Sequence, residues 1–174
     1  SHGHNIPSYE VFLSPDSGYT EGTLFCNQPI YQFGNIMKNV SLTFENGVVT
    51  QAHAETGNNA LQKILQVKNF NKVGEFSFTD KRLSSITHPM AATLFDENLS
   101  GENGNIHIAL GRSFVRSFTG SATTPISDLD SLGFNDCQEH IDFINTEDKK
   151  VTAISNDGQE IVIYEHGMFT FSLE

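Results

Sequence analysis

Alternation of apolar and polar positions dominates the chain and predicts β-strands. In "VSLTFENGVVTQAHAE", residues 40–55, two alternating runs flank Asn46-Gly47, a dipeptide that tolerates the positive φ angles of a tight hairpin turn. The same pattern returns in "KVTAISNDGQEIVIYEHGMFTFSL", residues 150–173, with turns at Asp157-Gly158 and His166-Gly167 between three short strands. "VGEFSF" (73–78) and "NIHIALG" (105–111) are further strand candidates bounded by turn residues. The pattern therefore predicts antiparallel hairpins and additional strands between them.

Helical spacing is clear in one segment. In "TGNNALQKILQV", residues 56–67, an Asn or Thr cap precedes apolar residues that share one helical face, which are Ala60, Leu61, Ile64 and Leu65. "MAATLFDEN" (90–98) predicts a second, shorter helix, and the polar stretch "TGSATTPISDLDSLG" (119–133) predicts an exposed loop. We therefore expect an α+β fold that is mainly antiparallel β, with a curved or barrel-like sheet and one or two attached helices. Residues 1–174 should form one domain.

Composition narrows the range of partners. Ten basic and twenty-one acidic residues give a formal net charge of -11, which argues against nucleic acid or anionic lipid as a partner. No apolar run approaches the length of a membrane helix, and the chain opens without a signal peptide. Cys26 and Cys137 are far apart and form no CxxC pair, so reduced cysteines in the cytoplasm are the simplest interpretation. The opening "SHGH" has the character of a tag remnant or of a truncated start.

The stretch "NDCQEHIDF", residues 135–143, carries the first candidate chemistry. On a strand, His140 and Asp142 would share a face about 7 Å apart, while Ile141 and Phe143 would anchor the other face. Such a pair could chelate one divalent cation or reach two neighbouring cations. The alternative is that both side chains are solvated on an exposed sheet face.

Three further polar residues lie in strand-like or chain-entry segments. They are His107 in "NIHIALG", Glu75 in "VGEFSF" and Glu10 in "NIPSYEVFLSP". Each has an ordinary interpretation: a surface or hydrogen-bonded histidine, an outward-facing strand charge, and an exposed charge near the chain terminus. Taken with His140 and Asp142, they offer a mixed nitrogen and oxygen set that suits Zn, Co or Mn better than Ca.

Four motifs occur together in one order along the chain: "NIPSYEVFLSP…TEGT" (5–23), "TLFDEN" (93–98), "HIALGRSF" (107–114) and "GFNDCQEHIDF" (133–143). In this order and spacing the sequence resembles the M29 metallo-aminopeptidases, the thermophilic-type aminopeptidases of bacteria. The resemblance implies an exopeptidase with two divalent metal ions that removes N-terminal residues from peptides. It corresponds to the carboxyl-terminal, metal-bearing half of such enzymes, which would work with an amino-terminal domain and as a homodimer.

The resemblance also implies roles for particular residues. Its motifs place the metal ligands at Glu10, Glu75, His107, His140 and Asp142. Glu75 is the candidate for the bridging or general-base role, and Glu10 is the second catalytic candidate.

The chain departs from the family pattern at two places. The family has a tyrosine seven residues after the first histidine, where this chain has Phe114, and "LSGENGNI" lengthens the connection that leads to His107. A one-residue shift of register there would turn His107 to the opposite face. The alternative function is therefore a non-catalytic β-rich domain used for oligomerisation or peptide binding, and a plain cation-binding acidic domain is a third possibility.

Overall fold

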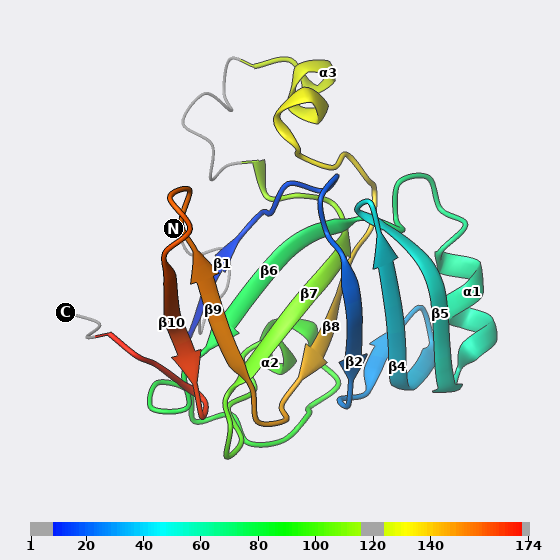
Figure 1. Ribbon diagram of the computed structural model, residues 1–174. Helices are drawn as coiled ribbons and strands as arrows, with labels where there is room; N and C mark the ends of the chain where they lie inside the picture. The colour runs from blue at the N-terminus through cyan, green and yellow to red at the C-terminus, as the bar shows by residue number, and fades with distance from the viewer. Residues whose placement is uncertain (1–8, 116–123, 172–174) are drawn as a thin grey trace.

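The computed structural model describes residues 9–115 and 124–171, and its strands pair antiparallel in three sheets that do not close into a ring (Figure 1). The first sheet has the order β1-β6-β7-β8 and is built from β1 (Glu10–Leu13), β6 (Val73–Thr79), β7 (Asn105–Gly111) and β8 (His140–Asn145). The second has the order β2-β4-β3, with β5 paired to β4, and contains β2 (Gly22–Cys26), β3 (Ile30–Gln32), β4 (Asn35–Glu45) and β5 (Val48–Thr56). The third has the order β11-β10-β9 and contains β9 (Lys150–Ile154), β10 (Glu160–Glu165) and β11 (Met168–Phe169).

The fold class and most predicted strands are confirmed. β4 and β5 form the expected hairpin, and Asn46 and Gly47 adopt φ angles of 50° and 74° at its turn. The predicted meander between residues 150 and 173 corresponds to β9, β10 and β11. β7 covers the predicted residues 105–111, so the longer connection before it has not shifted its start.

Three α-helices occur within residues 9–115 and 124–171, and they are shorter than predicted or absent from the prediction. α1 (Asn58–Ile64) buries Leu61, but its N-cap residue is Gly57, which makes no side-chain hydrogen bond, so the predicted Asn or Thr cap is wrong. α2 (Thr93–Asp96) lies within the predicted second helix. The loop predicted at 119–133 is wrong from residue 126 onward, where α3 (Ile126–Leu129) and a 3₁₀ turn (Asp130–Leu132) occur, while residues 119–123 lie outside the described residues. No helix in the described part of the chain is long and apolar enough to cross a membrane.

The main hydrophobic core lies between the first two sheets. Ile141 and Phe143 of β8 pack there with Leu110 of β7, Leu42 of β4 and Leu61 of α1. A smaller cluster of Phe78, Tyr164 and Phe169 joins the first sheet to the third. Both clusters pack against the same face of the first sheet. The other face of this sheet does not contribute to either cluster.

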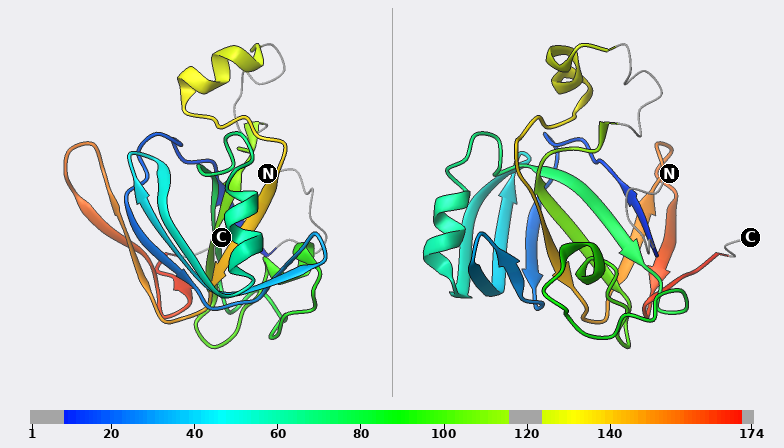
Figure 2. Two further views of the ribbon diagram at one scale, coloured as in Figure 1. Left: turned by 90° about the vertical axis from the view of Figure 1, so that its right-hand side faces the viewer. Right: turned by 180° about the vertical axis from the view of Figure 1, so that it is seen from behind.

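The segment that contains α2 crosses this other face, as the view from behind shows (Figure 2, right). Asn98, just after α2, accepts a hydrogen bond from the backbone N–H of Tyr9 at 2.7 Å. Asn105 at the start of β7 donates its side-chain amide to the carbonyl of Glu97 at 3.1 Å. These bonds fix the segment against β1 and β7.

Candidate metal centre

The five sequence-predicted residues lie on one face of the first sheet. Residues paired across antiparallel strands point to the same side. The pairs Ser77 with His107 and Ala109 with Asp142 therefore align His107 and Asp142, and the pair Gly111 with His140 adds His140 to the same face. Glu10 pairs with Thr79, two residues from Ser77, and so shares this face as well.

A β-bulge in β6 is needed to bring Glu75 there. Val73 pairs with Leu110 and Glu75 pairs with Ala109, so Gly74 is an extra residue that lies opposite no partner. A Cβ atom at position 74 would lie 2.3 Å from the carbonyl oxygen of Arg112, which only glycine avoids. The bulge lets Val73 face the core while Glu75 faces the polar side.

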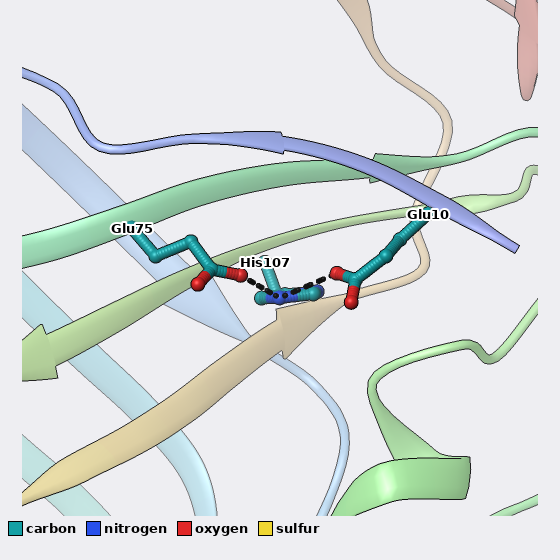
Figure 3. A group of neighbouring side chains, drawn as sticks. All are labelled: Glu10, Glu75 and His107. Atoms are coloured by element: carbon teal, nitrogen blue, oxygen red, sulfur yellow. Dashed lines mark hydrogen bonds and ion pairs between the residues drawn. The ribbon is translucent and has the colours of Figure 1, made fainter. Parts of the chain in front are cut away.

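His107 is the centre of the first half of the site (Figure 3). Its Nε2 atom lies 3.3 Å from Oε1 of Glu75 and 3.5 Å from Oε2 of Glu10. The Glu10 oxygen also accepts a hydrogen bond of 2.6 Å from the hydroxyl of Ser77. Ligand atoms of Glu10, Glu75 and His107 all lie within 4.8 Å of one another, so the three could hold a metal ion.

His140 is the centre of the second half. Its Nε2 atom lies 3.6 Å from Oε2 of Glu75 and 3.4 Å from Oδ1 of Asp142. Its Nδ1 atom donates a hydrogen bond of 2.8 Å to the carbonyl of Arg112. Because a carbonyl only accepts, Nδ1 carries a proton and the neutral ring presents Nε2 to a cation.

Burial rules out a surface position for most of these residues. His107 is fully buried, and Glu75 and Asp142 are 7% and 6% exposed. The Glu10 side chain is 2% exposed, and His140 is the most accessible of the five, with 34% of its side chain exposed. None of the four most buried groups is a solvated edge or surface charge.

Glu97 is a site residue that sequence reasoning missed. It follows α2, it is 6% exposed, and its charge interacts with those of Asp142, Glu10 and Glu75. The "TLFDEN" motif was the available signal, because it carries this acidic residue among the four family motifs. Only the tertiary placement of the α2 segment brings Glu97 to the other carboxylates.

Because acids and imidazoles lie close together in the site, their pKa values differ from the ordinary ones. Burial opposes protonation of His107, but the hydrogen bond to Glu75 and the charges of Asp142 and Glu10 outweigh it and raise its pKa to about 9. The pKa of His140 also rises to about 9, because contacts with Asp142 and Glu75 outweigh its burial. Burial and the charges of Asp142 and Glu10 raise the pKa of Glu97 to about 9. The pKa of Asp142 stays below its ordinary value despite burial, because the imidazoles of His140 and His107 favour its charged form.

The donor set fits divalent metal ions. Two ligand atoms about 2.1 Å from an ion at a tetrahedral angle are roughly 3.4 Å apart, and the four Nε2 to carboxylate distances run from 3.3 to 3.6 Å. Both carboxylate oxygens of Asp142 are buried and have no hydrogen-bond partner among the described residues. Nε2 of His140 lies 3.4 Å from one of these oxygens, and a cation held by both groups would satisfy the hydrogen-bonding capacity of the buried carboxylate.

Fold and donor set together are those of a metalloprotein built on an antiparallel sheet. The profile of the thermophilic metalloprotease family M29 matches residues 2–169. The chain therefore belongs to the M29 family.

Individual relatives agree with the profile. Aminopeptidase AmpS of Bacillus subtilis (strain 168) is 30% identical over 171 residues, which cover 96% of this chain and 40% of that protein. Aminopeptidase T of Thermus aquaticus is 27% identical and covers 94% of this chain and 39% of its own. The chain thus spans about 40% of the length of the curated relatives that it matches.

A solved structure shares the fold. Wild-type AmpT from Thermus thermophilus superposes with a TM-score of 0.78 at 23% sequence identity. The match covers 95% of this chain and 40% of that chain. The arrangement of sheets described above is therefore one that a longer protein uses for part of its length.

Proposed function

We propose that this chain is the metal-bearing part of a metal-dependent aminopeptidase and that it holds two divalent ions. The observation that carries the proposal is the position of Glu75, whose Oε1 faces Nε2 of His107 and whose Oε2 faces Nε2 of His140. A carboxylate with each oxygen directed at a different imidazole is suited to bridge two cations. Membership of a metalloprotease family whose named relatives are aminopeptidases supports the reaction class.

The ligands divide into two sets around Glu75. Glu10 and His107 complete one set, and His140 and Asp142 complete the other. We assign Glu97 as a sixth acidic group of the centre, because its charge interacts with carboxylates of both sets. Glu10, Glu75, Glu97 and Asp142 together carry four negative charges when ionised, which two divalent cations would neutralise. Without cations, this many buried acids would repel one another.

Bound divalent ions supply a water of lowered pKa and polarise the carbonyl of the scissile peptide bond. The protein residues hold the ligand atoms in place and manage the proton. Glu75 would act as the bridging carboxylate, and Glu10, of which only Oε2 faces His107, is then our candidate for the general base; were Glu75 bound to one ion alone, it would be the base instead. Ser77 orients Glu10 by its 2.6 Å hydrogen bond, and the Arg112 carbonyl orients His140.

The remaining expectations from the sequence belong to the same proposal. The ions would be Zn, Co or Mn, which accept mixed nitrogen and oxygen ligands. The partners would be a peptide substrate, the amino-terminal part of the full-length protein and a second copy of the chain. The location would be the cytoplasm, and residues 1–174 would act as one catalytic domain.

Metal analysis tests the centre directly. Protein exchanged into cobalt should retain close to two equivalents per chain at neutral pH, and His140→Ala should lower this number while the fold survives. His53→Ala is the matched control, because His53 is an exposed strand histidine on β5 and should leave the metal content unchanged. Retention of well under one equivalent by the unmodified protein would contradict the proposal. Hydrolysis of leucyl anilide by the metal-loaded full-length protein then tests the reaction.

Phe114 favours the alternative of a domain that has kept the fold and lost the chemistry. Its ring packs edge to face on Phe12, with ring centroids 5.1 Å apart. Phe12 pairs with Ser77 and so shares the face of the metal centre. Position 114 is therefore close to the site, but phenylalanine brings no hydroxyl where the family resemblance expects a tyrosine.

Phe114→Tyr separates the two functions. If the unmodified protein hydrolyses leucyl anilide, the hydroxyl is dispensable and the aminopeptidase assignment stands. If only the variant is active while both bind cobalt equally, this chain has lost the reaction and retained the metal centre. Phe171→Tyr, which alters a half-exposed ring on the chain after β11, is the matched control and should have no effect.

A further inference from the structure

Asn98, the residue after Glu97, is fully buried and contacts two segments that supply acids to the metal centre. Its side-chain carbonyl accepts the 2.7 Å hydrogen bond from the backbone N–H of Tyr9, the residue before Glu10. Its side-chain amide group donates to the carbonyl of Leu94 at 3.2 Å and lies 3.5 Å from Oε1 of Glu97. One side chain therefore joins the start of β1, where Glu10 lies, to the segment that carries Glu97.

Other residues hold the backbone around Asn98 independently of its side chain. Asn105 on β7 donates hydrogen bonds to the carbonyls of Glu97 and Leu99, on either side of Asn98. The hydroxyl of Ser84 donates to the carbonyl of Asn98 itself at 2.6 Å. The path of the segment is therefore fixed through main-chain carbonyls, and the side chain of Asn98 contributes a separate set of contacts.

These contacts are of the kind that orients metal ligands. A buried amide is costly unless its atoms are hydrogen-bonded, and both polar atoms of this side chain have partners next to acids of the site. In metal centres, hydrogen bonds from neighbouring groups commonly fix the orientation of the ligating carboxylates. The charge of Glu97 interacts with those of Asp142 and Glu10, so a change in the orientation of Glu97 would be felt in both halves of the centre.

We infer that Asn98 is a positioning residue of the metal centre, whose amide orients the carboxylate of Glu97 and fixes its place relative to Glu10. The inference rests on the proposed function, because it concerns how firmly the site holds its ions and which geometry it imposes on them. Asn98 acts through these two acids and is not itself a ligand.

The visible spectrum and the affinity of bound cobalt test this role. Asn98→Ala removes all contacts of the amide, and it should lower the cobalt affinity about tenfold or more, as loss of a group that orients metal ligands does. It should also change the position or intensity of the cobalt bands. Asn98→Asp keeps the volume and an acceptor for the N–H of Tyr9, but it replaces the donor beside Glu97 by a like charge. This variant should therefore change the cobalt bands as well.

Ser84→Ala is the matched control, because it removes the buried hydrogen bond to the carbonyl of Asn98 and leaves the amide in place. Urea denaturation of metal-free protein should show that Ser84→Ala is destabilised, as Asn98→Ala is, since each loses buried hydrogen bonds. The cobalt affinity of Ser84→Ala should nevertheless stay within about twofold of the unmodified protein, and its cobalt spectrum should be unchanged.

Two results would overturn the positioning role and leave the metal centre intact. One is an unchanged cobalt affinity and spectrum in Asn98→Ala and Asn98→Asp, and the other is the same spectral change in Ser84→Ala as in Asn98→Ala. If Asn98→Ala does not fold, the spectrum of Asn98→Asp, which preserves the volume, decides. Failure of the unmodified protein to retain cobalt would overturn the proposed function itself, and this inference with it.

Discussion

The two faces of the first sheet differ sharply although the same strands build both. Phe143 and Asp142 are neighbours on β8, and both are buried, one at 0% and the other at 6% exposure. Phe143 packs in the main core, where removal from water stabilises the fold. Asp142 lies among acids and imidazoles on the other face, where both of its oxygens lack hydrogen-bond donors in the described part of the chain. One face therefore stabilises the fold by apolar burial, and the other gathers charged side chains that could hold cations.

The largest expected effect comes from the apolar face. Phe143→Ala should lower the free energy of unfolding by about 3–5 kcal/mol, because it removes a fully buried ring and leaves a cavity. Urea denaturation of metal-free protein measures the change. Phe171→Ala is the control, since its ring is 50% exposed and its loss should cost within about 0.5 kcal/mol. A loss below about 1 kcal/mol for Phe143→Ala would contradict the division of roles between the faces.

The second-largest expected effect comes from the polar face, and it concerns the stabilisation of the protein by bound metal. Asp142→Asn should make metal-free protein less stable at neutral pH, because the lowered pKa of Asp142 means that His140 and His107 stabilise its charged form in the folded state. Cobalt at about one hundred times its dissociation constant should stabilise the unmodified protein by about 2.7 kcal/mol, and this gain should disappear in the variant. Asp148→Asn, at an exposed pair with His166, is the control. Equal stabilisation of Asp142→Asn and the unmodified protein by cobalt would show that Asp142 is not a ligand.

The smallest and most graded effect is the pH dependence of the metal-free protein. His107 and His140 have pKa values raised to about 9, above the ordinary value of 6.5, so the folded state binds protons more tightly than the unfolded state. The stabilisation is complete below pH 6.5 and is lost as the pH rises through about 9. The raised pKa of Glu97 acts in the same direction.

Thermal unfolding in the presence of a chelator, followed between pH 6.5 and 9, should therefore show falling stability. The slope should be weaker in His140→Ala. It should be unchanged in Phe171→Ala, which alters no titratable group. Stability that rises with pH over this range would contradict the protonation of the two imidazoles.

Much of the sheet could be predicted from alternation, because each buried strand needs an apolar face. The period of two correctly placed His140 and Asp142 on one side and Ile141 and Phe143 on the other. It also placed the strand of His107, because "NIHIALG" is bounded by turn residues on its amino-terminal side.

Other parts of the site depend on contacts between distant segments. Strict alternation would put Val73 and Glu75 on the same face, and only the bulge at Gly74 separates them. Only glycine fits at the bulge, because the carbonyl of Arg112 lies close to Gly74, and Arg112 is far away in the sequence. Glu97 joins the site through the folding of the α2 segment over the sheet, and no local pattern encodes this path. The helix at 126–129 was missed because its four residues are too few for helical periodicity to show.

The connection between Glu97 and His107 affects how members of this family can diverge. Both of its ends are held, since Asn105 bonds the carbonyls of Glu97 and Leu99, while Gly101 and Glu102 between them are exposed. Insertions and deletions in the exposed part can accumulate without altering which side chains meet at the centre. The length of this connection can therefore vary as it does in other surface loops. Sequence comparisons that penalise gaps will underestimate the similarity of family members across this stretch.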